Sequence, residues 1–186
     1  DPVNPIERVN MIISDSRSKV LIVEPALLSP VLCQRCTVLN PQDCKWDRGE
    51  TPIWNKINAS DTAYILYTSG SSGVPKAVKG TYRGMLNRLY WGWDTYPYEV
   101  NEVCCQKTSL GFVDSLFEIT GPLLQGIPLV IVNQMTLRDP FAFIQLLNKQ
   151  KISRLTVVPS FLRMLLEAMK DDRRQTASLK SIVCSG

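Results

Sequence analysis

Histidine is absent from the 186 residues of this chain. An active site built from these residues therefore has no imidazole general base. Ser-His triads, Cys-His dyads and His-ligated zinc are excluded with it. Any chemistry must depend on Lys, Arg, carboxylates, hydroxyls or backbone groups.

Long apolar runs are missing as well. No stretch approaches the roughly 20 apolar residues that a membrane-spanning helix needs, and no secretory signal is visible. We therefore expect no membrane span, a cytoplasmic location and reduced thiols rather than disulfides. The net charge is only +4, and no run of Lys and Arg forms a stripe, so nucleic acid is not an expected partner.

The six cysteines fall into two groups. Three have a spacing that hints at zinc, but no fourth ligand lies nearby, so loop thiols are the favoured interpretation. The other three lie in apolar, strand-like stretches, and we expect them in the core. The groups are Cys33, Cys36 and Cys44, and Cys104, Cys105 and Cys184.

Short apolar strands alternate with amphipathic helices along most of the chain. This alternation predicts an α/β fold with a mostly parallel sheet and helices on both faces. Ligands in such sheets bind at the carboxyl ends of the strands. The expected strands are 19–23, 63–67, 103–105, 129–132, 155–158 and 181–184. The expected helices are 7–13, 85–93, 115–124, 141–148 and 159–169.

Residues 25–60 have no clear period. Prolines recur there among Asn, Asp and Gly, which is typical of an irregular, linker-like connection. One short strand near Val38 is the exception that we expect. A dense group of aromatic residues at 90–98 has two interpretations, a stacking platform for bases or core packing, and packing is favoured because few basic residues interleave.

One segment has the composition of a phosphate-binding loop. It packs four hydroxyls, two glycines and a lysine directly behind an apolar strand, so free N–H groups and a mobile charge surround one turn. The lysine follows proline rather than glycine, which excludes a Walker loop. From composition alone, phosphate binding and a plain Ser/Gly hairpin turn stay equally open. The segment is Thr68, Ser69, Gly70, Ser71, Ser72, Gly73, Val74, Pro75 and Lys76.

Residues 67–78 resemble the signature of the adenylate-forming superfamily. That pattern is Tyr-Thr-Ser-Gly-(Ser/Thr)-(Ser/Thr)-Gly-x-Pro-Lys-Gly-Val, and this chain departs from it only at Ala77. The superfamily includes acyl-CoA synthetases, luciferases and the adenylation domains of nonribosomal peptide synthetases. Further stretches also fall into register, and peptide-synthetase adenylation domains fit best. They are 1–21, 112–126, 158–165 and 179–186.

The resemblance implies a reaction. A carboxylic acid and ATP would give an acyl-adenylate and pyrophosphate, and the acyl group would then pass to coenzyme A or to a carrier-bound phosphopantetheine. The Thr68–Gly73 loop would bind the β- and γ-phosphates with Mg²⁺, and Lys76 would be the catalytic cation. Phe112, Val113 and Asp114 would lie near the acyl pocket, and a residue of the turn formed by Ser185 and Gly186 would approach the adenylate. These five are the candidate substrate-binding residues. The expected partners are the small carboxylic acid and a carrier-protein domain.

Outside the 67–78 signature, two further positions differ from the residues that are common in the family. Peptide-synthetase adenylation domains have an aspartate directly after the phenylalanine, where it holds the α-amino group. Here Val113 fills that position, and the carboxylate is Asp114, one residue later. Tyr82 replaces a common histidine. The slip at Val113 argues against an ordinary α-amino acid as the substrate.

The resemblance also implies that residues 1–186 are an incomplete part of a larger AMP-binding domain. The ribose-binding aspartate and a further catalytic lysine would lie beyond Gly186. We therefore expect the parent protein to be the ligase and this chain alone to be inactive. A truncated, non-catalytic fragment that binds nucleotide or a partner is the alternative, and an unrelated phosphate-binding α/β domain is a third.

Overall fold

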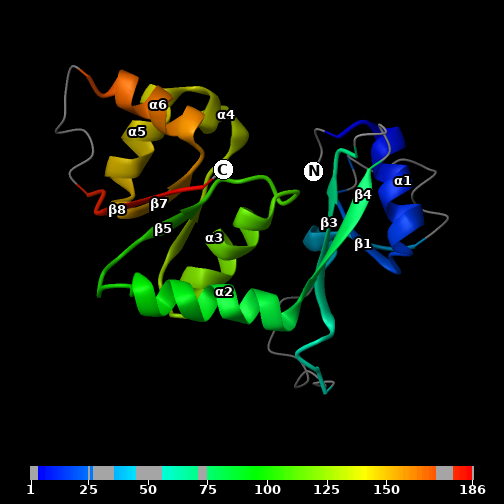
Figure 1. Ribbon diagram of the computed structural model, residues 1–186. Helices are drawn as coiled ribbons and strands as arrows, with labels where there is room; N and C mark the ends of the chain where they lie inside the picture. The colour runs from blue at the N-terminus through cyan, green and yellow to red at the C-terminus, as the bar shows by residue number, and fades with distance from the viewer. Residues whose placement is uncertain are drawn as a thin grey trace. The chain divides into compact units, whose positions relative to one another are not determined.

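A computed structural model describes residues 4–24, 26, 36–44, 56–70, 75–170 and 178–185. The chain divides into two compact units, residues 1–85 and 86–186 (Figure 1). Within the described ranges, no helix is both long enough and apolar enough to cross a membrane.

The first unit holds one helix and two separate strand pairs. In one pair the strands are parallel, with Leu21 opposite Val38, so the strand expected near Val38 exists. In the other pair the strands are antiparallel and form a hairpin. The elements are α1 (Ile6–Ser16), β1 (Val20–Ile22), β2 (Thr37–Leu39), the 3₁₀ helix η3 (Pro41–Asp43), β3 (Thr62–Thr68) and β4 (Lys76–Thr81).

The second unit contains a four-stranded parallel sheet in the order β6-β5-β7-β8. Helices α5 and α6 cover one face, and α2 and α3 lie on the other (Figure 1). The elements are α2 (Tyr82–Thr95), which begins before the unit boundary, β5 (Cys104–Gln106), α3 (Val113–Leu123), β6 (Leu129–Ile131), α4 (Gln134–Arg138), α5 (Pro140–Lys149), β7 (Arg154–Val157), α6 (Pro159–Ala168) and β8 (Ser181–Cys184).

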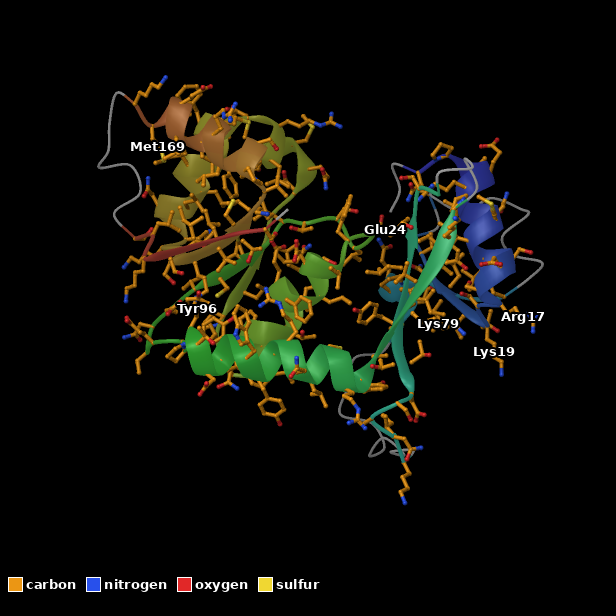
Figure 2. The ribbon with its side chains drawn as sticks, viewed as in Figure 1. Arg17, Lys19, Glu24, Lys79, Tyr96 and Met169 are labelled. Atoms are coloured by element: carbon orange, nitrogen blue, oxygen red, sulfur yellow. The ribbon has the colours of Figure 1, made fainter. Side chains whose placement is uncertain are left out.

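The core of this unit lies between the sheet and helices α5 and α6, where side chains fill the space (Figure 2). Phe143 and Ile144 of α5 are fully buried against Leu155 and Val157 of β7. Helix α5 begins where the sequence indicates, because the Asp139 carboxylate accepts hydrogen bonds from two backbone N–H groups of its first turn.

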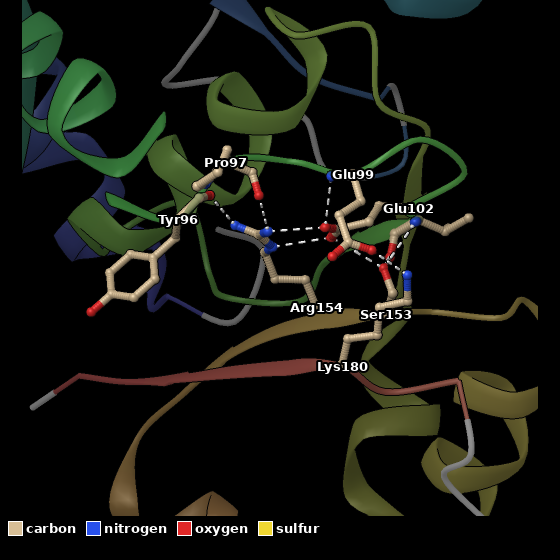
Figure 3. Close-up of polar contacts among 8 residues, drawn as sticks. Tyr96, Pro97, Glu99, Glu102, Ser153, Arg154 and Lys180 are labelled. Carbon is tan, nitrogen blue, oxygen red and sulfur yellow. Dashed lines mark hydrogen bonds and ion pairs between the residues drawn. The ribbon is translucent and has the colours of Figure 1, made fainter. Parts of the chain in front are cut away.

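An ion-pair network lies at the amino-terminal end of β7 in the parallel sheet (Figure 3). The Arg154 guanidinium contacts both carboxylate oxygens of Glu102, at 3.1 Å and 3.0 Å. It also donates to the carbonyls of Tyr96 and Pro97, at 2.7 Å and 2.9 Å. The connection between α2 and β5 is therefore bound to the start of β7.

The α/β fold class is confirmed, with one correction at a residue, Cys184, and one additional helix, α4. Cys104 and Cys105 are buried as expected, but Cys184 is exposed, because it lies on β8 at the edge of the described sheet. Burial raises the pKa of the Cys104 thiol to about 11 and of the Cys105 thiol to about 12, so neither is a thiolate at neutral pH. Helix α4 was not expected from the sequence.

Candidate active site

The motif segment is the loop of the β3–β4 hairpin. Thr68 and Lys76 are paired in its antiparallel ladder, and the Thr68 hydroxyl lies 3.5 Å from the Lys76 carbonyl oxygen. Thr68, Ser69 and Lys76 are exposed and Gly70 is half-buried. Ser71, Ser72 and Gly73 lie outside the described residues. The segment therefore connects two paired strands, and its binding of phosphate stays a prediction.

Tyr67 fixes the strand from which this loop begins. Its phenol donates to Oδ2 of Asp15 on α1 at 2.6 Å, and Arg8 lies 3.5 Å from its carbonyl oxygen. Partial burial and the Asp15 carboxylate raise the pKa of Tyr67 to about 12, so the phenol stays a hydrogen-bond donor at neutral pH. Lys76 itself has no carboxylate within ion-pair distance among the described residues.

In the second unit, a cavity of about 470 Å³ lies at the carboxyl ends of β5, β7 and β8. This is the edge where ligands bind in parallel sheets. Three helices complete its wall: α3, α4 and α6. The lining residues are Lys107, Thr108, Ser109, Phe112, Asp114, Gln134, Leu137, Arg138, Thr156, Val157, Val158, Phe161 and Ser185.

Three of the predicted substrate-binding residues meet at this cavity. Asp114 lies in the first turn of α3, and its Oδ2 accepts a hydrogen bond of 2.8 Å from the Ser185 hydroxyl at the end of β8. Phe112 lines the same space. Val113 is not among the lining residues, and Gly186 lies outside the described residues. The carboxylate that the chain presents here therefore belongs to Asp114.

The sequence places Glu118 within the 112–126 resemblance without indicating a role for its side chain. Residues 106–109 follow an expected strand, and two interpretations apply to them: they line the same cleft or, as the favoured one, they form a plain strand-end loop. The Glu118 carboxylate is buried and contacts the backbone of Lys107 and Thr108. Lys107, Thr108 and Ser109 line the cavity. Their position directly after β5 was the available signal, since strand ends form such sites.

Four of the aromatic residues at 90–98 line a smaller cavity of about 90 Å³: Trp91, Trp93, Tyr96 and Tyr98. The Trp93 indole donates to the Gly121 carbonyl at 3.0 Å, which binds α2 to α3. Arg88 stacks on the Trp91 ring, 4.6 Å from its centroid. Trp93 is therefore an anchor between helices, as the packing interpretation expects, while Trp91 and Tyr90 are exposed.

Among the described residues, no three His, Cys, Asp or Glu side chains gather where they could hold a metal ion. Cys33 lies outside those residues, and Cys44 contacts the Asn40 carbonyl at 3.5 Å. The described cysteines therefore give no support to a zinc site.

Comparisons with known proteins extend over the whole chain. The beta-alanyl-bioamine nonribosomal peptide synthetase ebony of Drosophila melanogaster is 45% identical over 130 residues, which are 67% of this chain and 15% of the relative. Enterobactin synthase component F of Escherichia coli (strain K12) is 32% identical over 191 residues, which are 98% of this chain and 14% of that protein. The chain thus spans only a small part of these relatives.

Solved structures have the same fold. The nonribosomal peptide synthetase FmoA3 in its alpha-methyl-L-serine-AMP bound form superposes with a TM-score of 0.85 at 22% identity, over 99% of this chain and 21% of that one. The O-succinylbenzoate coenzyme A synthetase MenE of Bacillus subtilis gives 0.80 at 16% identity, over 100% of this chain and 47% of that one. The model of the AMP-binding enzyme family matches residues 1–186, and the chain belongs to that family.

Proposed function

We propose that the protein containing this chain is a ligase that activates a carboxylic acid with ATP. The products of the first step would be the acyl-adenylate and pyrophosphate, and the acyl group would then pass to a thiol. The observation that carries this proposal is the motif hairpin, with Lys76 at its neck and no carboxylate paired to it among the described residues. Two structural neighbours are bound to AMPPNP and to an acyl-adenylate, which supports the same chemistry.

The residues of the hairpin suit a triphosphate. The hydroxyls of Thr68 and Ser69 and the backbone around Gly70 would contact phosphate oxygens, with the Ser71–Gly73 part of the motif. Lys76 would offset the charge that develops on the departing pyrophosphate, which is the main demand of a reaction between two anions.

Mg²⁺ fits this scheme without a cage of protein carboxylates. It usually keeps several waters and binds substrate phosphates, so few protein ligands are needed. Its part would be to neutralise phosphate charge. Since ATP and pantetheine thiols are metabolites of the cell interior, we also propose a cytoplasmic location, which cell fractionation would test.

We propose further that the acid is a small amino acid with its amino group on the β-carbon. Asp114, not Val113, presents the carboxylate at the cavity. Consecutive residues on a helix are rotated by about 100° about its axis. The Asp114 carboxylate, which would pair with the substrate ammonium, is therefore displaced from the position that would hold an α-amino group. The printed name of the ebony relative, a beta-alanyl-bioamine synthetase, supports this class.

The peptide-synthetase relatives favour a carrier-bound phosphopantetheine over coenzyme A as the thiol. A carrier-protein domain, in the same polypeptide or separate from it, is therefore the proposed partner.

Acid-dependent ATP–pyrophosphate exchange by the full-length protein tests the proposal. We expect β-alanine to support faster exchange than α-alanine, 4-aminobutyrate or propionate. The matched pair of variants is Asp114→Asn, which should abolish the preference for the amine, and Val113→Asp with Asp114→Val, which should shift the preference toward α-alanine. No exchange with any acid would contradict the ligase, whereas fastest exchange with α-alanine would contradict only the β-amino class.

A further inference from the structure

Glu118 is the most completely hydrogen-bonded carboxylate at the cavity edge of the described sheet. Its side chain is 2% exposed. Oε2 accepts hydrogen bonds from the backbone N–H groups of Lys107 and Thr108, at 3.0 Å and 2.9 Å. Oε1 accepts from the Thr108 hydroxyl at 2.8 Å and from the Lys107 ammonium at 3.2 Å. Each oxygen therefore has two donors.

All four donors come from two consecutive residues. Lys107 and Thr108 directly follow β5, where the chain leaves the sheet and has no ladder partner to fix its course. The carboxylate of Glu118 replaces that partner, and charge-assisted hydrogen bonds of this kind are stronger than neutral ones. The path of residues 107–109, which form one wall of the cavity, thus depends on Glu118.

The charge of Lys107 is used within this arrangement. Its ammonium is paired with Glu118 and lies 5.5 Å from the centroid of the Phe161 ring on α6. Only 10% of the Lys107 side chain is exposed. Although Lys107 lines the cavity, its charge is neutralised by Glu118, so it is not a free cation for a substrate carboxylate.

Helix α3 carries both Asp114 and Glu118. They are four residues apart, and residues at this spacing lie on the same face of a helix, one turn from each other. One rigid turn therefore relates the Asp114 carboxylate, the proposed partner of the substrate amine, to the Glu118 carboxylate, which holds the 107–109 wall. The cavity lies between Asp114 and that wall.

We propose that Glu118 is a positioning residue that determines the substrate length by holding the 107–109 wall at a fixed distance from Asp114. This inference rests on the proposed function for the identity of the acid. The anchoring of the wall itself does not, and it can be measured without turnover.

The test compares Glu118→Gln with Glu102→Gln in the full-length protein. Glu102 is the matched control because it is also a buried carboxylate, 3% exposed and paired with an arginine. Its contacts are with Ser153 and Arg154 at the start of β7 and with the Glu99 N–H in the α2–β5 connection. Both variants leave a buried cation without its partner. Only Glu118→Gln replaces a carboxylate oxygen that accepts hydrogen bonds from the cavity wall with an amide NH2 group, which donates.

We expect Glu118→Gln to speed amide hydrogen exchange at residues 107–109 and to raise the KM for β-alanine by about 10- to 100-fold, since small misplacements of a binding wall have effects of this size. The KM for ATP should stay within about twofold of wild type, and 4-aminobutyrate should gain relative to β-alanine. Glu102→Gln should change none of these ratios. Glu118→Asp, which keeps the charge but is one methylene shorter, should give the same pattern more weakly if Glu118→Gln does not fold.

Unchanged amide hydrogen exchange at residues 107–109 in the folded Glu118 variants would overturn the inference. An equal rise in the KM for β-alanine in Glu102→Gln would also overturn it. So would an unchanged selectivity between β-alanine and 4-aminobutyrate in Glu118→Gln. If the wild-type protein shows no acid-dependent ATP–pyrophosphate exchange, the proposed function fails. Amide hydrogen exchange at residues 107–109 then decides by itself whether Glu118 holds the wall.

Discussion

Lys76 and Lys79 lie three residues apart on β4, and both side chains are exposed. Lys76 stands opposite Thr68 at the neck of the motif loop. Lys79 is paired with Ile65 further along the hairpin, and Figure 2 labels it. The two lysines have the same charge and lie on the same strand. A comparison of their alanine variants therefore separates a local effect on phosphate from a general effect of net charge.

We expect Lys76→Ala to lower the rate of adenylate formation by about 10²–10³-fold, because one group that stabilises developing charge contributes on this scale. Lys79→Ala should stay within about twofold of wild type. Pyrophosphate exchange at saturating acid is the measurement. Equal losses in the two variants would mean that the hairpin acts only through its overall charge, and the assignment of Lys76 would be withdrawn.

At the scale of residues, the sequence indicates which side chains carry chemistry but not which of them meet. Asp114 stands out because it is displaced from the family pattern. Its partner Ser185 is 71 positions away, and no local period relates the two. Glu118 belongs to the 112–126 stretch that resembles the family, but the resemblance does not indicate what its side chain contacts. Its role depends on the course of the chain after β5, which is a property of tertiary structure.

At the scale of elements, the Glu102–Arg154 pair joins the α2–β5 connection to β7. Burial alone would raise the pKa of Glu102. The hydrogen bonds from Arg154, the Glu99 backbone N–H and Ser153 outweigh that effect and hold the pKa below its usual value of 4.5. The folded state therefore keeps this carboxylate ionised at a pH where the unfolded chain has begun to protonate it.

The sign of the pH dependence follows from that shift. The pair stabilises the fold fully above the unfolded pKa, and the contribution is lost as the pH falls below about 4.5 toward the lower folded pKa. We expect Glu102→Gln to reduce the local free energy of unfolding by about 3 kcal/mol at pH 7. The difference from wild type should shrink as the pH falls from 4.5.

Amide hydrogen exchange at residues 102–106 of the full-length protein, corrected for the intrinsic rate at each pH, measures this effect. Glu99→Gln is the control, because Glu99 and its partner Lys180 are 68% and 55% exposed and screened by water. A difference between wild type and Glu102→Gln that stays constant down to pH 3 would contradict the proposed origin of the stability.

Most strands and helices of the chain could be predicted, because the regular spacing of apolar residues that indicates each of them lies within a single short segment of the sequence. Strands β7 and β8 and helices α5 and α6 begin and end within about two residues of the expected positions. Helix α4 has five residues, which is too short to show a period. Cys184 was placed in the core because an apolar strand does not reveal whether it lies inside a sheet or at its edge.

At the scale of the whole molecule, apolar side chains remain exposed on both outer strands of the parallel sheet. Ile131 on β6 is 79% exposed and Ile182 on β8 is 41% exposed. In the other unit, Val78 on the hairpin is 50% exposed. Edge strands with apolar side chains are sites of aggregation unless other segments cover them. The chain spans 15% and 14% of the lengths of two relatives, and in a protein of that length further segments would be available to cover these strands.

This reasoning predicts different behaviour for residues 1–186 made alone and for the full-length protein. The isolated polypeptide should unfold over a broad temperature range and bind a hydrophobic dye, because its exposed apolar strands lack their covering surface. It should also show no pyrophosphate exchange, because the resemblance places the ribose-binding aspartate and a further catalytic lysine beyond Gly186. The full-length protein should give a sharp transition without dye binding. Calorimetry with dye fluorescence is the measurement. A sharp, cooperative transition of the isolated polypeptide would mean that its two units are stable by themselves and that the exposed side chains on β6, β8 and the hairpin need no cover.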